Sequence, residues 1–340
     1  MMTRKEIIKA IENALVRKES EFIISNFEFE QSFENQLLFF FKPECFFQGN
    51  TPELRNLVDM TLKKFIRFDV GISGILLVDG KRLEELSIMD RHYGFINKLS
   101  RESSKILSRK ELIKVRDSLG IENISGYQVI GGHEFLKQHT GFNEESLNEL
   151  WMTKKSIKLR SGFYLQEYDV NEKKIILING FHPSQLRHYT NPLHKIFVLL
   201  LHSNTNWKIL KNDLAGDTFP ERAKEDSIRG EIFKKRENYG LSNVSISSNC
   251  IHLSAGPFEA LFEINNFLKN IKGIKFNLGS TNIARLMNEK EKGIKEEEIE
   301  RCLLNPTTEI NGTSIDLFTF TEEKDTTKGV SDFCEFFLNK

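Results

Sequence analysis

The chain has 340 residues, of which 48 are Lys or Arg and 48 are Asp or Glu, so its formal net charge is zero. A chain of this length can bury a large core, and its balanced charge predicts no general attraction to nucleic acid or to anionic membranes. The four cysteines, Cys45, Cys250, Cys302 and Cys334, are far apart and lack metal-ligand spacing. Reduced, buried thiols are the simplest interpretation. The charged N-terminus lacks the apolar core of a signal peptide, and every apolar run is too short to span a bilayer. The sequence therefore predicts a cytoplasmic protein.

The first hundred residues alternate between helical and strand patterns. In chain order they predict a helix over residues 4–19, a buried strand over 35–43, a helix from Thr51 to about 65, a strand over 69–78 that closes in an Asp79-Gly80 turn, and a helical stretch to about Leu99.

The remaining chain divides into an insertion, a second part of the core and a tail. Residues 101–182 predict two helices (108–120 and 143–155) followed by two strands (161–170 and 173–180) joined by an Asn171 turn. Beyond them, helical and strand patterns alternate again to about 268, and residues 288–302 are predicted to be a solvated helix. The predicted parts are an N-terminal helical extension (1–35), a first part of the core (36–100), the insertion (101–182), a second part of the core (183–270) and a C-terminal extension (271–340).

Without the insertion, strand and helix alternate four times. This order predicts an α+β sandwich of the ferredoxin-like type, with an antiparallel sheet and helices on one of its faces, interrupted by an α/β insertion.

Two polar loops of the second core part carry residues suited to phosphate chemistry. Arginine offers a planar fork of donors for phosphate oxygens, and threonine and asparagine add neutral donors. A histidine among such groups can attack phosphorus and form a covalent intermediate, and a glutamate can orient its imidazole. The residues concerned are Thr218, Arg229, Asn249, His252, Ser254 and Glu263.

This set resembles the nucleoside diphosphate kinases. The resemblance covers residues 36–99 and 183–268, and its longest motif is AGDTFPERAKEDSIRGE (215–231), which follows the family's Gly-x-Thr…Ile-Arg-Gly pattern. NCIHLSAG (249–256) is similar to the family's histidine signature, FFFKPE (39–44) to the end of its first strand, and HYGF (92–95) to its His-Tyr helix element.

The resemblance implies a role for each matching residue. His252 would carry the phosphate transiently, with Ser254 and Glu263 supporting it and Lys42 and Tyr93 near the transferring group. Thr218 and Arg229 would bind the nucleotide phosphates, and Asn249 the ribose or a phosphate. The family needs Mg²⁺ bridging the nucleotide phosphates, and its members are usually oligomeric, so NTP, NDP and a second copy of the chain are the implied partners.

The chain departs from the family at four places, one of which is a longer connection from Arg229 to Asn249 (230–248). Asn212 stands where the family has a second phosphate-binding arginine, with Lys211 beside it as a substitute charge. Ala255 replaces an aspartate, and the insertion begins where the family's base-stacking phenylalanine would follow Leu99. We expect the insertion to alter which nucleotide or acceptor is used. Its polar candidates are interpreted mainly as structural or interface residues: His133, Glu134, Arg160, His182 and His188.

Two functions remain open at this level. The first is a phosphotransferase that moves the γ-phosphoryl group of an NTP through His252 to an NDP or another acceptor. The second is a catalytically weak nucleotide-binding module whose insertion and tail bind a protein partner. For His252 alone, a buried structural histidine would be the simpler interpretation; the matching residues around it favour phosphate chemistry.

Overall fold

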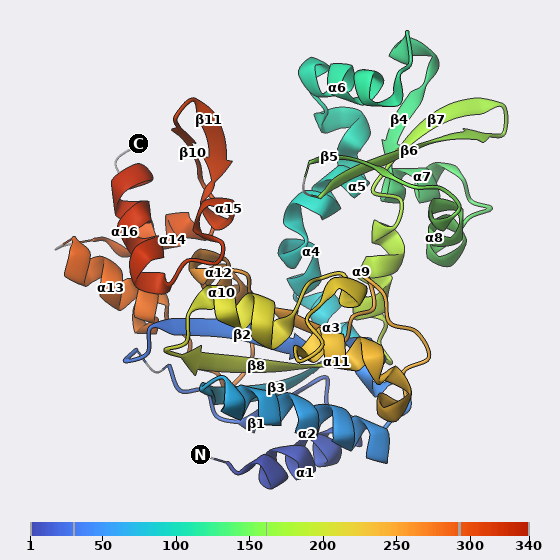
Figure 1. The fold of residues 1–340 in the computed structure, drawn as a ribbon. Coiled ribbons are helices and arrows are strands. Elements are labelled where there is room, and N and C mark those ends of the chain that lie inside the picture. Colours follow the sequence, from blue (N-terminus) through green and yellow to red (C-terminus); the bar gives the residue numbers. More distant parts are fainter. Residues whose placement is uncertain (1, 30, 161, 292–293, 339–340) are drawn as a thin grey trace. The chain divides into compact units, whose positions relative to one another are not determined.

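The structure of the chain is a computed structural model that describes residues 2–29, 31–160, 162–291 and 294–338. It divides into two compact units (Figure 1). The first comprises Met1–Arg82 with Pro192–Lys340, and the second comprises Leu83–Asn191. Each unit is described by itself below.

The first unit is built on a five-stranded antiparallel sheet. Its strands are β1 (Glu21–Ser25), β2 (Asn35–Phe41), β3 (Val70–Asp79), β8 (Lys195–Ser203) and β9 (Ile251–Leu253), in the spatial order β1-β3-β8-β2-β9. Every neighbouring pair is antiparallel. Because β8 lies between β2 and β3, the four strands β2, β3, β8 and β9 have the split arrangement of the ferredoxin-like fold, as the sequence predicts.

Helices cover both faces of this sheet. Alternate residues of β2, such as Phe39, join a core with α1 (Arg4–Leu15), α2 (Pro52–Arg67), α10 (Trp207–Ile209), the π-helical turn η3 (Leu210–Ala215) and α11 (Ile228–Lys234). On the opposite face, Phe40 packs against Phe267 of α12 (Pro257–Leu268), with ring centroids 5.4 Å apart. The prediction of helices on one face only was wrong. Since both faces are covered, β2 is buried along its whole length and shows no polar alternation.

The C-terminal region has a hydrophobic core of its own, which includes Phe258 and Leu261 of α12. Its elements are η6 (Leu278–Ser280), α13 (Asn282–Lys290), α14 (Glu296–Cys302), the hairpin β10 (Thr307–Ile310) with β11 (Thr313–Asp316), α15 (Leu317–Thr321) and α16 (Thr326–Phe336). Because α12 packs against the sheet through Phe267 and against this core through Phe258 and Leu261, it joins the C-terminal region to the sheet.

The second unit is a four-stranded mixed sheet with helices on both faces. Its strands have the order β4-β7-β6-β5, in which β4 (Gln128–Gly131) and β7 (Lys173–Ile178) are parallel and β5 (Ile157–Arg160) and β6 (Phe163–Val170) complete the antiparallel part. Its helices are α4 (Ile88–His92), α5 (Gly94–Ile106), α6 (Arg109–Leu119), α7 (Gly132–Gln138), α8 (Glu144–Met152) and α9 (His182–Thr190).

Most predicted helices and strands are confirmed, with two local corrections. Asp79 and Gly80 do not form a turn: Asp79 Oδ1 accepts the N–H of Arg82 at 2.8 Å and so caps the short helix α3 (Gly80–Glu85). Residues 288–302 are not one solvated helix, because α13 ends at Lys290 and α14 buries Ile299 and Cys302; Lys292 and Gly293 lie outside the described residues. The four cysteines are free and buried, as expected. Among the described residues, no helix is long and apolar enough to cross a membrane.

Candidate active site

His252 lies on the edge strand β9, and a strained residue just before that strand sets its position. Cys250 has φ = 68°, a conformation that side chains other than glycine rarely adopt. Hydrogen bonds with residues 42–45, which directly follow β2, keep Cys250 in this conformation. The Lys42 N–H donates to Cys250 O at 2.8 Å, the Cys250 N–H donates to Glu44 Oε1 at 2.8 Å, and Cys45 Sγ lies 3.2 Å from Cys250 O. These contacts fix the bend that leads the chain onto β9.

The pairing of β9 with β2 places the His252 ring on the α12 face of the sheet. Phe40 is directly opposite His252 in the register, and paired side chains lie on the same face. The two rings stack with centroids 4.6 Å apart and planes inclined by 17°. The imidazole thus lies against the face of the Phe40 ring, with its Nε2 directed at Glu263 of α12.

A chain of hydrogen bonds links His252 to α12. His252 Nε2 lies 2.7 Å from Glu263 Oε1, and Ser254 Oγ donates to Glu263 Oε2 at 2.5 Å. Ser254 Oγ also accepts the Leu38 N–H at 3.0 Å. Because an ionised Glu263 carboxylate can only accept hydrogen bonds, its contact with Nε2 requires the ring proton to be on that nitrogen. The lone pair of the neutral ring is therefore on Nδ1.

The electrostatic surroundings keep this ring neutral. Burial, together with the positive charges of Lys42 and Arg229, lowers the pKa of His252 well below its usual range. Burial also lowers the pKa of Lys42, and the Glu44 carboxylate partly offsets this effect. Within the described part of the chain, no hydrogen bond or ion pair engages Lys42 Nζ. A neutral imidazole beside a buried amine is suited to attack an anionic electrophile such as a phosphate.

Arg229 connects the two polar loops that the sequence predicted to meet. Its Nη1 donates to Gly216 O at 2.6 Å and its Nη2 to Ile251 O at 3.2 Å. Ile251 directly precedes His252, so the guanidinium lies at the histidine strand. The structure therefore brings Arg229 and His252 together, as expected.

The start of α11 explains why glycine follows this arginine. A Cβ atom at Gly230 would lie 2.0 Å from Lys224 O, which is too close for any side chain. Ser227 caps the helix, because its Oγ accepts the Gly230 N–H at 3.1 Å and donates to Lys224 O at 2.6 Å. The Ser-Ile-Arg-Gly sequence thus folds a tight helix start that holds Arg229.

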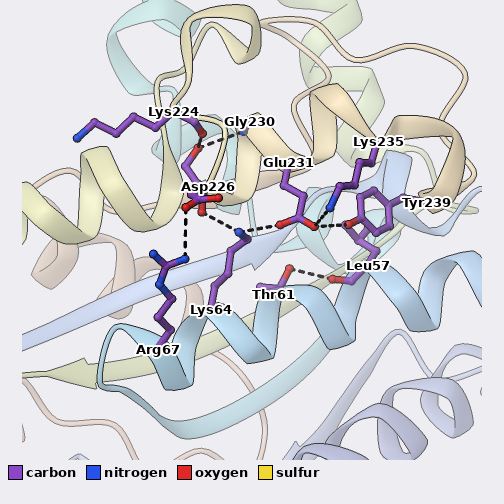
Figure 2. Close-up of polar contacts among 11 residues, drawn as sticks. Leu57, Thr61, Lys64, Arg67, Lys224, Asp226, Gly230, Glu231, Lys235 and Tyr239 are labelled. Atoms are coloured by element: carbon purple, nitrogen blue, oxygen red, sulfur yellow. Dashed lines mark hydrogen bonds and ion pairs between the residues drawn. The ribbon is translucent and has the colours of Figure 1, made fainter.

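A largely buried ion pair fastens α11 to α2 (Figure 2). Lys64 Nζ lies 2.8 Å from Glu231 Oε2 and donates to Asp226 O at 2.7 Å, while Lys235 and Tyr239 bind Glu231 Oε1 at 2.8 and 3.1 Å. Burial would raise the pKa of Glu231, but the hydrogen bonds from Lys235 and Lys64 outweigh it and lower the pKa to about 2. This network positions the helix that carries Arg229.

Asn249 and Thr218 meet through the amide of Asn249. Its Nδ2 donates to Thr218 O at 3.1 Å and to Ile246 O at 3.2 Å, which uses both amide protons. Its Oδ1 is buried and has no partner among the described residues. The side chain of Thr218 is exposed. The remaining acceptor on Asn249 suits a ligand hydroxyl, which can donate to it, better than an ionised phosphate oxygen, which only accepts hydrogen bonds.

The other two predicted nucleotide-site residues have different surroundings. Lys211 lies on η3, where its Nζ pairs with the carboxylates of Glu322 and Glu323. Tyr93 belongs to the second unit, where its hydroxyl lies 3.3 Å from that of Tyr189. Their roles at a nucleotide stay predictions.

The polar candidates of the insertion contact neighbours within the second unit. Burial lowers the pKa of His133 to about 3 and that of His182 to about 4, so both rings are neutral at pH 7. The partners are Ser100 for His133, Ser104 for Glu134, Glu111 for Arg160, Gln185 for His182 and Tyr189 for His188.

Sequence reasoning gave no role to several residues that shape the site. Glu44 and Glu231 lie inside two of the motifs that carried the resemblance, so the sequence could have pointed to them. Glu259 lies one helical turn before Glu263, and burial and the Glu263 charge raise its pKa to about 8. No local pattern marked the bend at Cys250, which depends on contacts from residues about two hundred positions away.

Comparisons with known proteins place few constraints on the chain. No family model matches it, and a search of curated proteins found no match. Among solved structures, the crystal structure of an NDP kinase from Pyrobaculum aerophilum is similar over 71% of this chain and 99% of that chain, with 17% sequence identity and a TM-score of 0.34.

Proposed function

We propose that the chain is a nucleotide-dependent phosphotransferase that uses His252 as a transient phosphate carrier. The nucleotide would be an NTP, and the acceptor an NDP or another nucleophile. The observation that carries this proposal is the hydrogen-bonded chain of Ser254, Glu263 and His252, set beside the positive charges of Lys42 and Arg229.

Each step of the transfer uses a group whose position is described above. The lone pair on His252 Nδ1 attacks the γ-phosphorus, the bond from phosphorus to the β-phosphate oxygen breaks, and the NDP leaves with that electron pair. The Nε2 proton stays on the ring, where its hydrogen bond to Glu263 offsets the developing positive charge. The acceptor oxygen then attacks the phosphorus, and the P–N bond breaks.

The surrounding donors fit a nucleotide polyphosphate. Lys42 and Arg229 offer cationic donors to phosphate oxygens, and Asn249 Oδ1 offers an acceptor to a sugar hydroxyl. Ammonium and guanidinium groups do not ligate metal ions, so the phosphates themselves would hold Mg²⁺. Bound in this way, Mg²⁺ neutralises phosphate charge.

The test is covalent labelling with γ-labelled ATP and Mg²⁺. We expect acid-labile label on the wild-type protein and on His188→Ala, a matched histidine control in the second unit, and none on His252→Ala. Subsequent addition of GDP, UDP or CDP separates the acceptors: label cleared by a diphosphate indicates nucleoside diphosphate kinase activity, and label that persists indicates another acceptor. Absence of label on the wild-type protein would refute covalent transfer.

The second candidate function, a nucleotide-binding module, is favoured by one contact. Lys211, the predicted substitute for the family's second arginine, is already paired with two glutamates. In this case the insertion and the C-terminal extension would bind a protein partner. Nucleotide binding that is equal in the wild type and in His252→Ala, without turnover by either protein, would support this function.

A further inference from the structure

The linker between α15 and α16, residues 322–325, lies against the loop that follows His252. The Glu323 N–H donates to Ala255 O at 3.0 Å. A Cβ atom at Gly256 would lie 2.9 Å from Thr321 O, so glycine is needed for this close approach. Glu323 itself has φ = 62°, an unfavourable conformation that the surrounding contacts must maintain.

The linker brings two carboxylates onto one ammonium group. Glu322 and Glu323 both pair with Lys211 Nζ, and Asn212 Nδ2 donates to Glu323 Oε1 at 3.2 Å. Burial opposes the charge on Lys211, but its hydrogen bonds to Glu322 and Glu323 outweigh this and raise its pKa. Lys211 is therefore a charged ammonium whose position on η3, which packs against β9, is next to the histidine strand.

The geometry points to Glu322 and Glu323 as specificity-determining residues that compete with phosphate groups for Lys211. This inference rests on the proposed function. A polyphosphate that reaches Lys211 must displace two carboxylates and lies beside their negative charge. The electrostatic cost of binding near these carboxylates grows with the negative charge of the ligand. The site therefore binds the more highly charged of two phosphate ligands less favourably than its charge alone would predict.

The linker is also anchored by hydrogen bonds that do not involve these two side-chain charges. Asp325 accepts the Trp207 N–H at 2.8 Å and the Asn206 amide at 2.6 Å, and the Thr326 N–H donates to Asn35 Oδ1 at 3.1 Å. Glu322 and Glu323 are also partly exposed. Replacing Glu with Gln at these positions therefore changes charge while retaining the linker's anchors.

The test measures equilibrium binding of tripolyphosphate and of orthophosphate to the full chain. Four proteins are compared: the wild type, Glu322→Gln/Glu323→Gln, the same pair with Lys211→Met, and Glu296→Gln/Glu297→Gln. The last is a matched control, because it removes two adjacent exposed charges from α14. We expect the first pair to bind tripolyphosphate about 3- to 10-fold more tightly than the wild type, with a smaller gain for orthophosphate.

The gain should vanish when Lys211→Met is added and should be absent in the control pair. No gain, an equal gain in the control pair, or a gain that persists without Lys211 would overturn the inference. Labelling of His252 separates the two proposals. Tighter tripolyphosphate binding without labelling by ATP would retain this inference and reject the transferase. Labelling by ATP without tighter tripolyphosphate binding would retain the transferase and reject this inference.

Discussion

The ion pair between α11 and α2 gives a stability prediction that can be worked from the structure. Glu231→Gln removes the negative charge that Lys64 faces, while Lys64 is only 9% exposed at its side chain. The pKa of Glu231 lies at about 2, against 4.5 for an ordinary glutamate. At about 1.4 kcal/mol per pKa unit this corresponds to about 3.5 kcal/mol. Solvent screening at a carboxylate that is 19% exposed reduces this value, so we expect Glu231→Gln to lower the free energy of unfolding by about 2–3 kcal/mol at pH 7.

The pH dependence has a definite sign. Because folding lowers the pKa of Glu231, its contribution to the free energy of unfolding is complete above about pH 5 and declines as the pH falls toward 2. The cost of Glu231→Gln should therefore be largest near neutral pH and shrink in acid. Lys235→Met is the control: its side chain is 51% exposed, and we expect a loss below about 1 kcal/mol.

Urea unfolding followed by tryptophan fluorescence measures these changes. Trp207 is buried in the first unit and Trp151 lies in the second, so a Trp151→Phe background makes the signal report the first unit. Equal losses for Glu231→Gln and Lys235→Met, or a Glu231→Gln loss that stays constant down to pH 3, would refute the assigned role of the Lys64–Glu231 pair.

Three further predictions concern the site. Ser254→Ala removes one donor from the buried carboxylate that orients His252, so labelling by ATP should slow by about 10- to 100-fold while nucleotide affinity changes little; equal labelling rates would contradict the hydrogen-bonded chain. Gly230→Ala places a Cβ 2.0 Å from a backbone oxygen and should lower the free energy of unfolding by more than about 2 kcal/mol, whereas Gly141→Ala, with open space around it, should change it by less than about 1 kcal/mol. Burial and a nearby carboxylate raise the pKa of Glu259 to about 8, so wild-type stability should fall as the pH rises from 5 to 8, and Glu259→Gln should flatten this decline in urea unfolding; an unchanged slope would contradict the raised pKa.

Local sequence patterns predicted most of the fold because the apolar periodicity of the core elements is strong. The strands around Phe40 and Val198 are continuous apolar runs, and the helix after Thr51 has both a cap and an apolar face. The short strands β1, β5 and β10 were not predicted, since four or five half-buried residues leave little periodic signal. The helix that begins at Pro257 was predicted, but its place on the second face of the sheet was not, because periodicity shows that a helix has an apolar side but not which surface it covers.

The resemblance to a family predicted the individual residues of the candidate site. It did not predict the contacts that support these residues. His252, Ser254, Glu263 and Arg229 lie close together, but no local sequence pattern shows that Cys250 must bend the chain toward β9. The approach of Glu322 and Glu323 to Lys211 joins positions more than a hundred residues apart, which a single sequence does not reveal. The five-part division of the chain stays a prediction.

The most direct test of the proposed function is to locate the phosphate on the protein. Protein labelled with ¹⁵N in its eight histidines would be phosphorylated with ATP and Mg²⁺ and examined by NMR for phosphorus–nitrogen coupling. The account predicts coupling to Nδ1 of His252 alone, with the Nε2 proton retained, and its loss when an acceptor is added. Coupling to Nε2, phosphate on another residue, or no phosphorylation under turnover conditions would contradict it.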